Sequence, residues 1–184
     1  MDNADSAKPA EILLVDDDEN YAFLTREAFS QAKLRANLHH VSDGRQCLQF
    51  LRRQPPYADA PVPDIILLDI EMPVMDGRQV LAEIVKDDAL KHLAVVVLTS
   101  RDEHAEILHM YQLRCNSYIC KPAAFDQYVN VIKKLADYWL SVGIVIGLEQ
   151  PATARDLLAL IEADEVERVA LSSDAAAFLD ESVE

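Results

Sequence analysis

Four short apolar segments of this chain each run directly into side chains that can carry chemistry. Continuous runs of Val, Ile and Leu are typical of strands buried on both faces of a parallel sheet. The segments are residues 12–15, followed by Asp16, Asp17 and Asp18; residues 65–68, followed by Asp69; residues 95–98, followed by Thr99; and residues 118–120, followed by Lys121. In such sheets, ligands bind beyond the carboxyl ends of the strands, where the strand order reverses. The sequence therefore predicts one acidic site that also holds a hydroxyl and an ammonium group.

Helical patterns separate the predicted strands. Residues 36–41 alternate enough to form a further strand, so that five strands are expected in all. Helices are expected over residues 18–32, over residues 47–51 after a turn and cap at 42–44, from 77 onward, and over 102–113 and 125–140. Five strand-then-helix units imply an α/β fold, in which right-handed crossovers wind helices onto both faces of a parallel sheet.

Composition and charge divide the chain and limit its partners. We expect a flexible leader over residues 1–10, one domain over residues 11–141, and an extension over residues 142–184 that is partly helical or disordered. Residues 151–184 carry nine acidic and two basic side chains, a net charge of −7. The whole chain has a net charge of −15, which argues against nucleic acid or an anionic membrane as the direct partner. Without a membrane-length apolar stretch or a signal-peptide pattern, we expect a soluble cytoplasmic protein.

The acidic side chains predict a site for a divalent cation. Asp16, Asp17 and Asp69 would repel one another unless a cation lay between them, and hard oxygen ligands favour Mg²⁺. We expect Asp17 and Asp69 to bind the ion directly and Asp16 to act through water. The backbone carbonyl of Glu71 is a third expected ligand, because the chain turns there toward Pro73.

The same residues suit phosphoryl transfer to a carboxylate. Asp69 would be the nucleophile and form an acyl phosphate. Lys121 would pair with one phosphoryl oxygen as a point charge, and the Thr99 hydroxyl would donate to another. Each residue alone has an ordinary explanation, since an aspartate after a strand is usually a helix cap or a turn residue. The prediction depends on all of them occurring together and in order.

These motifs resemble the receiver domain of two-component response regulators over roughly residues 10–140. The matching segments are Val15-Asp16-Asp17, residues 68–77, Leu98-Thr99-Ser100 and residues 118–122. The resemblance implies a flavodoxin-like sheet with strand order 2-1-3-4-5, and an Asp69 that takes phosphate from a kinase histidine with Mg²⁺. It also implies that Thr99 and the aromatic Tyr118 reorient as a switch. Ser100 stands where the family often has a small alanine.

A narrower resemblance points to a kind of kinase and to an output. Residues 53–63, 87–92 and 137–139 are similar to single-domain response regulators of bacterial phytochrome-type histidine kinases. No DNA-binding pattern or enzyme domain follows, so we expect output through protein contacts. The apolar side chains of Tyr138, Trp139, Leu140 and residues 142–146 predict a homodimer that uses the last helix and this extension. The alternative is that the extension folds back on its own domain.

Two other functions use similar residues. A phosphatase of the haloacid dehalogenase type also has an aspartate nucleophile, a Thr or Ser, a Lys and Mg²⁺. It needs a second acid two residues after the nucleophile, and Glu71 is a poor candidate for that role. The other alternative is a scaffold that keeps the fold without phosphorylation, which the intact set of acids disfavours. We therefore expect a phosphoacceptor that is not an enzyme in its own right.

Overall fold

The computed structural model of the protein describes residues 9–142. The predicted leader and the predicted C-terminal extension therefore lie almost wholly outside the described residues. In chain order the elements are β1 (Ala10–Val15), α1 (Glu19–Gln31), β2 (Ala36–Val41), α2 (Gly44–Leu51), β3 (Ile65–Leu68), α3 (Gly77–Lys86), β4 (Val95–Thr99), α4 (His104–Gln112), β5 (Ser117–Cys120), α5 (Phe125–Ala136) and the π-helical segment η1 (Asp137–Val142). Within the described residues no helix is both long and apolar enough to cross a lipid bilayer.

The five strands form one parallel sheet in the order β2-β1-β3-β4-β5, which confirms the predicted α/β fold and strand order. The chain passes from β1 outward to β2 and then crosses back to β3 on the other side of β1. The strand order therefore reverses between β1 and β3, and their carboxyl ends border the expected crevice.

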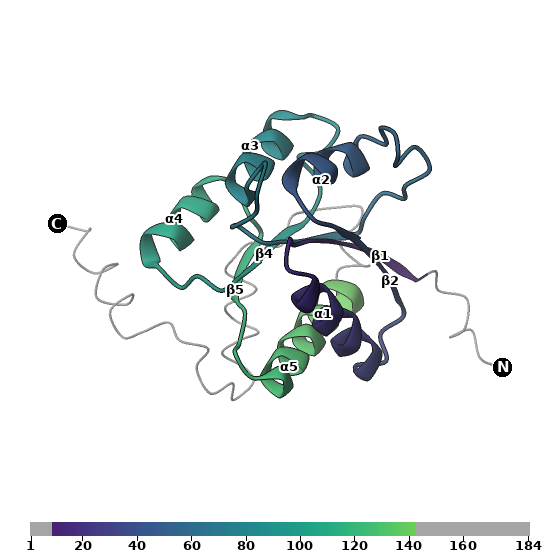
Figure 1. Cartoon of the computed structure of the whole chain (residues 1–184), viewed down its shortest axis with the longest axis vertical. Coiled ribbons are helices and arrows are strands. Elements are labelled where there is room, and N and C mark those ends of the chain that lie inside the picture. The colour runs from purple at the N-terminus through teal and green to yellow at the C-terminus, as the bar shows by residue number, and fades with distance from the viewer. Residues whose placement is uncertain (1–8, 143–184) are drawn as a thin grey trace. The chain divides into compact units, whose positions relative to one another are not determined.

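Helices cover both faces of the sheet, α2, α3 and α4 on one face and α1 and α5 on the other (Figure 1). Successive residues of the central strands alternate between the two cores, as the twofold repeat of a strand requires. On β1, Leu13 and Val15 join the first core, whereas Ile12 and Leu14 join the second. Burial on both faces explains why these strands are continuous apolar runs.

Aspartates begin three of the helices that follow strands. The side chains of Asp18, Asp43 and Asp76 each accept a backbone N–H of the first helical turn, of α1, α2 and α3 respectively. At α3 the bond is reciprocated, because the Gln79 side chain accepts the backbone N–H of Asp76 and completes a capping box. Capping accounts for these acids, and so separates them from the acids of the candidate site.

The last helix differs from its prediction. The apolar pattern predicted one helix through residue 140, but the α-helical hydrogen bonding of α5 ends at Ala136 and gives way to a π-helical segment. Trp139 in this segment packs against the core between the sheet, α1 and α5, and its ring meets that of Tyr138 edge-on. The wider turn therefore occurs where a large aromatic side chain continues the buried face of the helix.

Candidate functional site

Three aspartates meet at the carboxyl ends of β1 and β3. One carboxylate oxygen from each of Asp16, Asp17 and Asp69 lies within 4.8 Å of the other two. The strand ladder continues past the strand ends, because the Asp16 N–H donates to Val41 and the Asp69 N–H donates to Val15. These backbone hydrogen bonds fix the positions from which the side chains of Asp16 and Asp69 extend. Asp16 is buried, Asp69 is half-buried and Asp17 is exposed, so the cluster opens to solvent on one side.

The ammonium group of Lys121 lies directly against this cluster. Its Nζ is 2.6 Å from Oδ2 of Asp16 and 3.0 Å from Oδ2 of Asp69, and its side chain is only 2% exposed. Burial alone would lower the pKa of Lys121, but the charges of the two carboxylates raise it above its ordinary value. Lys121 therefore remains an ammonium at neutral pH. Burial raises the pKa of Asp16, and the pairing with Lys121 opposes that rise.

Thr99 ends the neighbouring strand β4 and is buried. Its carbonyl accepts the backbone N–H of Lys121 at 2.6 Å, so the ends of β4 and β5 are bonded to each other. Because β4 pairs with β3, Thr99 and Lys121 lie at the same carboxyl end of the sheet as Asp69. The functional role of Thr99 stays a prediction.

The loop after β3 passes very close to the backbone of Asp69. At Gly77 an added Cβ would overlap the carbonyl oxygen of Asp69 and lie 2.9 Å from Cα of Ile70. The N–H of Gly77 also donates to the Ile70 carbonyl at 2.9 Å. Glycine is therefore required here because the start of α3 packs against the peptide that carries the predicted nucleophile. Asp69 Oδ1 in turn accepts the N–H of Ile70 at 2.7 Å.

The Glu71 side chain is bonded away from the acid cluster. Its carboxylate is exposed and accepts a hydrogen bond from Arg101, on the loop between β4 and α4, and this bond lowers the pKa of Glu71. An ionised, paired carboxylate is unsuited to donate a proton, which is the role that a phosphatase of the haloacid dehalogenase type would require. The predicted metal ligand at Glu71 is its backbone carbonyl, and that assignment stays a prediction.

Tyr118, the predicted switch residue, is half-buried on β5. Its hydroxyl donates to the carbonyl oxygen of Arg101 at 2.9 Å, and the Cys120 thiol donates to the same oxygen at 3.3 Å. Burial raises the pKa of the Tyr118 phenol, so it is a neutral donor at physiological pH. The structure thus ties Tyr118 to the β4–α4 loop, and its movement on phosphorylation stays a prediction.

Two residues near the cluster had no sequence signal. The ring centroid of Tyr21 lies 4.2 Å from Nζ of Lys121, and Nε2 of His40 lies 2.8 Å from the carbonyl oxygen of Asp16, to which it donates. Tyr21 falls in the first turn of α1 and His40 falls within β2. Each reads as an ordinary member of its helix or strand, and only the packing of neighbouring elements brings it to the site.

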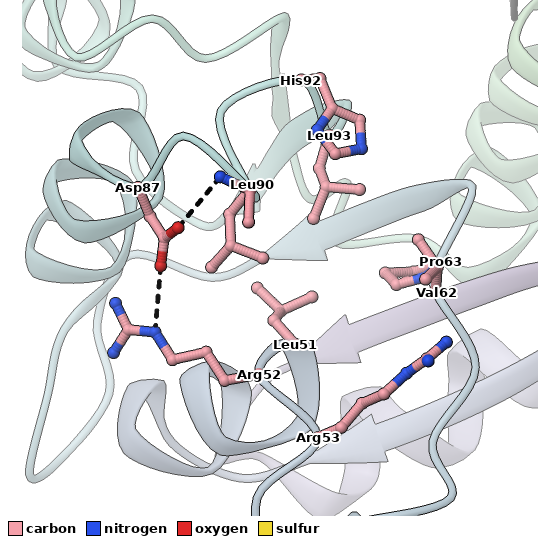
Figure 2. Close-up of a pocket in the computed structure, with 10 residues that line it drawn as sticks. Leu51, Arg52, Arg53, Val62, Pro63, Asp87, Leu90, His92 and Leu93 are labelled. Atoms are coloured by element: carbon pink, nitrogen blue, oxygen red, sulfur yellow. Dashed lines mark hydrogen bonds and ion pairs between the residues drawn. The ribbon is translucent and has the colours of Figure 1, made fainter.

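A separate hollow of about 420 Å³ lies between the segments that precede β3 and β4, at the opposite end of these strands from the acids (Figure 2). Leu51, Leu90 and Leu93 point into it, and Arg52 at its rim pairs with Asp87 at 3.2 Å. Its lining is mainly apolar and its charged groups include no cluster of acids. The chemistry predicted from the sequence therefore belongs to the acidic site and not to this hollow.

Comparison with known proteins agrees with the fold. Residues 12–133 match the family described as the response regulator receiver domain. The response regulator Rcp1 of Synechocystis sp. is 33% identical over 136 residues, which cover 74% of this chain and 92% of Rcp1. The chain therefore belongs to the response regulator receiver domain family, and the resemblance noted in the sequence is confirmed.

Two solved structures show the same fold at similar identity. The phosphorylated cyanobacterial phytochrome response regulator RcpA is 38% identical, with a TM-score of 0.69 and coverage of 72% of this chain and 95% of that one. The Mn²⁺-bound form of Rcp1 is 32% identical, with a TM-score of 0.68 and coverage of 78% of this chain and 100% of that one. One relative was thus solved with a phosphoryl group and another with a divalent cation.

Proposed function

We propose that this protein accepts a phosphoryl group from the phosphohistidine of a sensor histidine kinase onto Asp69. The observation that carries the proposal is the meeting of a half-buried Asp69 with a buried ammonium, Lys121, and two further carboxylates, Asp16 and Asp17. A carboxylate with a cation on one side and a metal-binding acid pair on the other is suited to bond to a phosphoryl group. Membership of the receiver family supports the same step.

In the proposed step a carboxylate oxygen of Asp69 attacks phosphorus and forms the P–O bond of an acyl phosphate. The P–N bond of the kinase phosphohistidine breaks, and its electron pair remains on the imidazole nitrogen. Lys121 pairs with one phosphoryl oxygen, and the Thr99 hydroxyl donates to another. Later hydrolysis transfers the phosphoryl group to water and restores Asp69. The protein is thereby a phosphoacceptor with self-catalysed turnover of its own phosphoryl group, and not an enzyme acting on a separate pool of substrate.

The donor set fits Mg²⁺ as the cofactor. Asp17 and Asp69 would bind the ion directly, Asp16 through water, and the backbone carbonyl of Glu71 would complete the protein ligands. The ion would supply positive charge that offsets the repulsion between the phosphoryl group and the carboxylates. Support comes from the three oxygens within 4.8 Å and from the Mn²⁺ bound to the relative Rcp1.

The proposed output is a change of a protein-interaction surface. When Thr99 is drawn toward the phosphoryl group, Tyr118 would exchange its bond to the Arg101 carbonyl for an inward position. The face formed by α4, β5 and α5 would then change its affinity for partners. No contact with nucleic acid or membrane is part of this proposal, and the expected location is the cytoplasm.

The proposed kinase is of the phytochrome type, on the support of the phytochrome regulator RcpA among the similar structures. The proposed assembly is a homodimer through α5 and the residues that follow it. Sedimentation of the full chain and of a chain ending at Ser141 tests the assembly. A dimer that persists unchanged after this truncation would contradict the proposed interface, and a monomeric full chain would contradict the dimer itself.

Phosphorylation by acetyl phosphate tests the proposed phosphoacceptor. With Mg²⁺ the full chain is expected to gain one phosphoryl group by intact mass, and the gain is expected to be lost in Asp69→Asn. Asp88→Asn, which changes an exposed acid in the loop after α3, is the matched control and should label normally. Labelling of Asp69→Asn, or no labelling of the wild type, would contradict the proposal. Repeated turnover of small phosphomonoesters would instead favour a phosphatase.

A further inference from the structure

The ring of Tyr21 is the third group that surrounds the ammonium of Lys121. Its centroid lies 4.2 Å from Nζ, within the range at which an aromatic face attracts a cation. The other two groups are the carboxylates of Asp16 and Asp69, at 2.6 and 3.0 Å. Since the Lys121 side chain is 2% exposed, these three groups replace nearly all of the water that would otherwise surround the charge.

The ring is itself held in place from α5. Tyr128 meets it edge-on, with centroids 6.0 Å apart and planes at 72°. Thr25 donates to the Tyr21 carbonyl at 2.7 Å, and its hydroxyl oxygen lies 2.7 Å from the Tyr128 hydroxyl, which donates to it. Thr25 and Tyr128 are both buried. The ring therefore cannot shift far without disturbing the packing between α1 and α5.

We propose that Tyr21 is a positioning residue whose ring holds the Lys121 ammonium where it can pair with a phosphoryl oxygen on Asp69. This inference rests on the proposed function. Asp16 and Asp69 are also proposed metal ligands, so when a metal ion binds, their negative charge is divided between that ion and Lys121. The ring face offers no ligand atom to a metal and keeps its attraction for the ammonium. A charge held in place before reaction needs no reorganisation when phosphate arrives.

Two substitutions of Tyr21 distinguish the effect of its aromatic face from the effect of its size. Tyr21→Leu keeps an apolar side chain but removes the aromatic face, whereas Tyr21→Phe keeps the face and loses only the hydroxyl. We expect phosphorylation by acetyl phosphate to slow about tenfold in Tyr21→Leu, the factor that a shielded contact between a cation and a ring provides. Tyr21→Phe should restore a rate close to wild type. Phe23→Leu is the matched control, because Phe23 is an exposed aromatic on the same helix.

The experiment measures two quantities on the full chain with Mg²⁺. The first is the phosphorylation rate over a range of acetyl phosphate concentrations, where the loss should appear in the maximal rate. The second is the NMR shift of the Lys121 side chain, which the ring current of Tyr21 should move upfield. That shift should be present in wild type, Tyr21→Phe and Phe23→Leu and absent in Tyr21→Leu. A purely structural role would not produce this pattern, and a native amide spectrum of Tyr21→Leu excludes misfolding.

The outcomes distinguish this inference from the proposed function. If wild type labels on Asp69 and Tyr21→Leu labels equally fast, the positioning role is wrong and the phosphoacceptor stands. If Tyr21→Phe is as slow as Tyr21→Leu, the hydroxyl and not the ring face matters, which also overturns the inference. If wild type takes no phosphoryl group, the proposed function fails and the positioning role fails with it, even where the Lys121 shift reports the ring contact.

Discussion

The buried pair between Lys121 and Asp16 allows a sharp prediction about stability. In Lys121→Met a flexible apolar side chain replaces the ammonium that now lies 2.6 Å from Asp16 Oδ2 and 3.0 Å from Asp69 Oδ2. Asp16 is 1% exposed, so its carboxylate would lose its cation without gaining water. Removing one partner of a buried ion pair lowers the unfolding free energy by about 3–5 kcal/mol, chiefly because the remaining charge is left uncompensated. For a chain of this size about 3 kcal/mol lowers Tm by roughly 10 °C.

The dependence of this loss on pH has a definite sign. Burial raises the pKa of Asp16 above its ordinary value of 3.8, and Lys121 opposes that rise, so removing Lys121 raises the pKa further. The folded variant then binds this proton more tightly than the unfolded chain does. Its unfolding free energy should therefore increase as pH falls through the raised pKa, and its deficit against wild type should shrink between neutral and mildly acidic pH.

Urea unfolding of four proteins measures the effect: wild type, Lys121→Met, Asp16→Asn, and the double variant. The double variant should regain much of the stability lost in Lys121→Met, because no buried charge is left without a partner. The reasoning is refuted if the unfolding free energy of Lys121→Met at neutral pH lies within roughly 1 kcal/mol of the wild-type value, since that is the contribution of an exposed ion pair. It is equally refuted if Asp16→Asn brings no recovery in the double variant.

Three further predictions concern the surroundings of the site. Gly77→Ala should destabilise the fold by about 2 kcal/mol or more, because its Cβ would overlap the Asp69 carbonyl; chemical unfolding measures this, and an unchanged midpoint would contradict the close packing. Asp76→Ala should cost about 1 kcal/mol through loss of the capping box of α3, whereas Asp76→Asn, which can still cap, should cost less. Burial raises the pKa of the Cys47 thiol to about 12, so alkylation at pH 8 followed by mass mapping should modify Cys47 only under denaturing conditions. Modification of native Cys47 as fast as of the half-buried Cys120 would refute that assignment.

The elements were predictable because local patterns and tertiary demands agree. Two predicted strands, Ala36–Val41 and Ile65–Leu68, match the structure residue for residue, and the segment predicted at residues 118–120 lies within the strand Ser117–Cys120. Helix starts were predictable where an aspartate supplies the cap, as Asp43 does for α2. The end of the last helix was not, because the apolar repeat continues through the change from α- to π-helical hydrogen bonding at Asp137. Periodicity reports which face is buried and not which hydrogen-bond pattern the backbone adopts.

The sequence by itself determined a parallel sheet of five strands and the set of acids, hydroxyl and ammonium at its carboxyl edge, because apolar strands in a wound sheet must deliver the residues that follow them to one side. Only the tertiary structure decided what each charge contacts. Lys121 pairs with Asp16, 105 residues away in the chain, and Glu71 bonds to Arg101 across two loops. The Tyr21 ring reaches the ammonium because α1 packs beside α5. Such contacts depend on distances between elements, which no periodicity along the chain encodes.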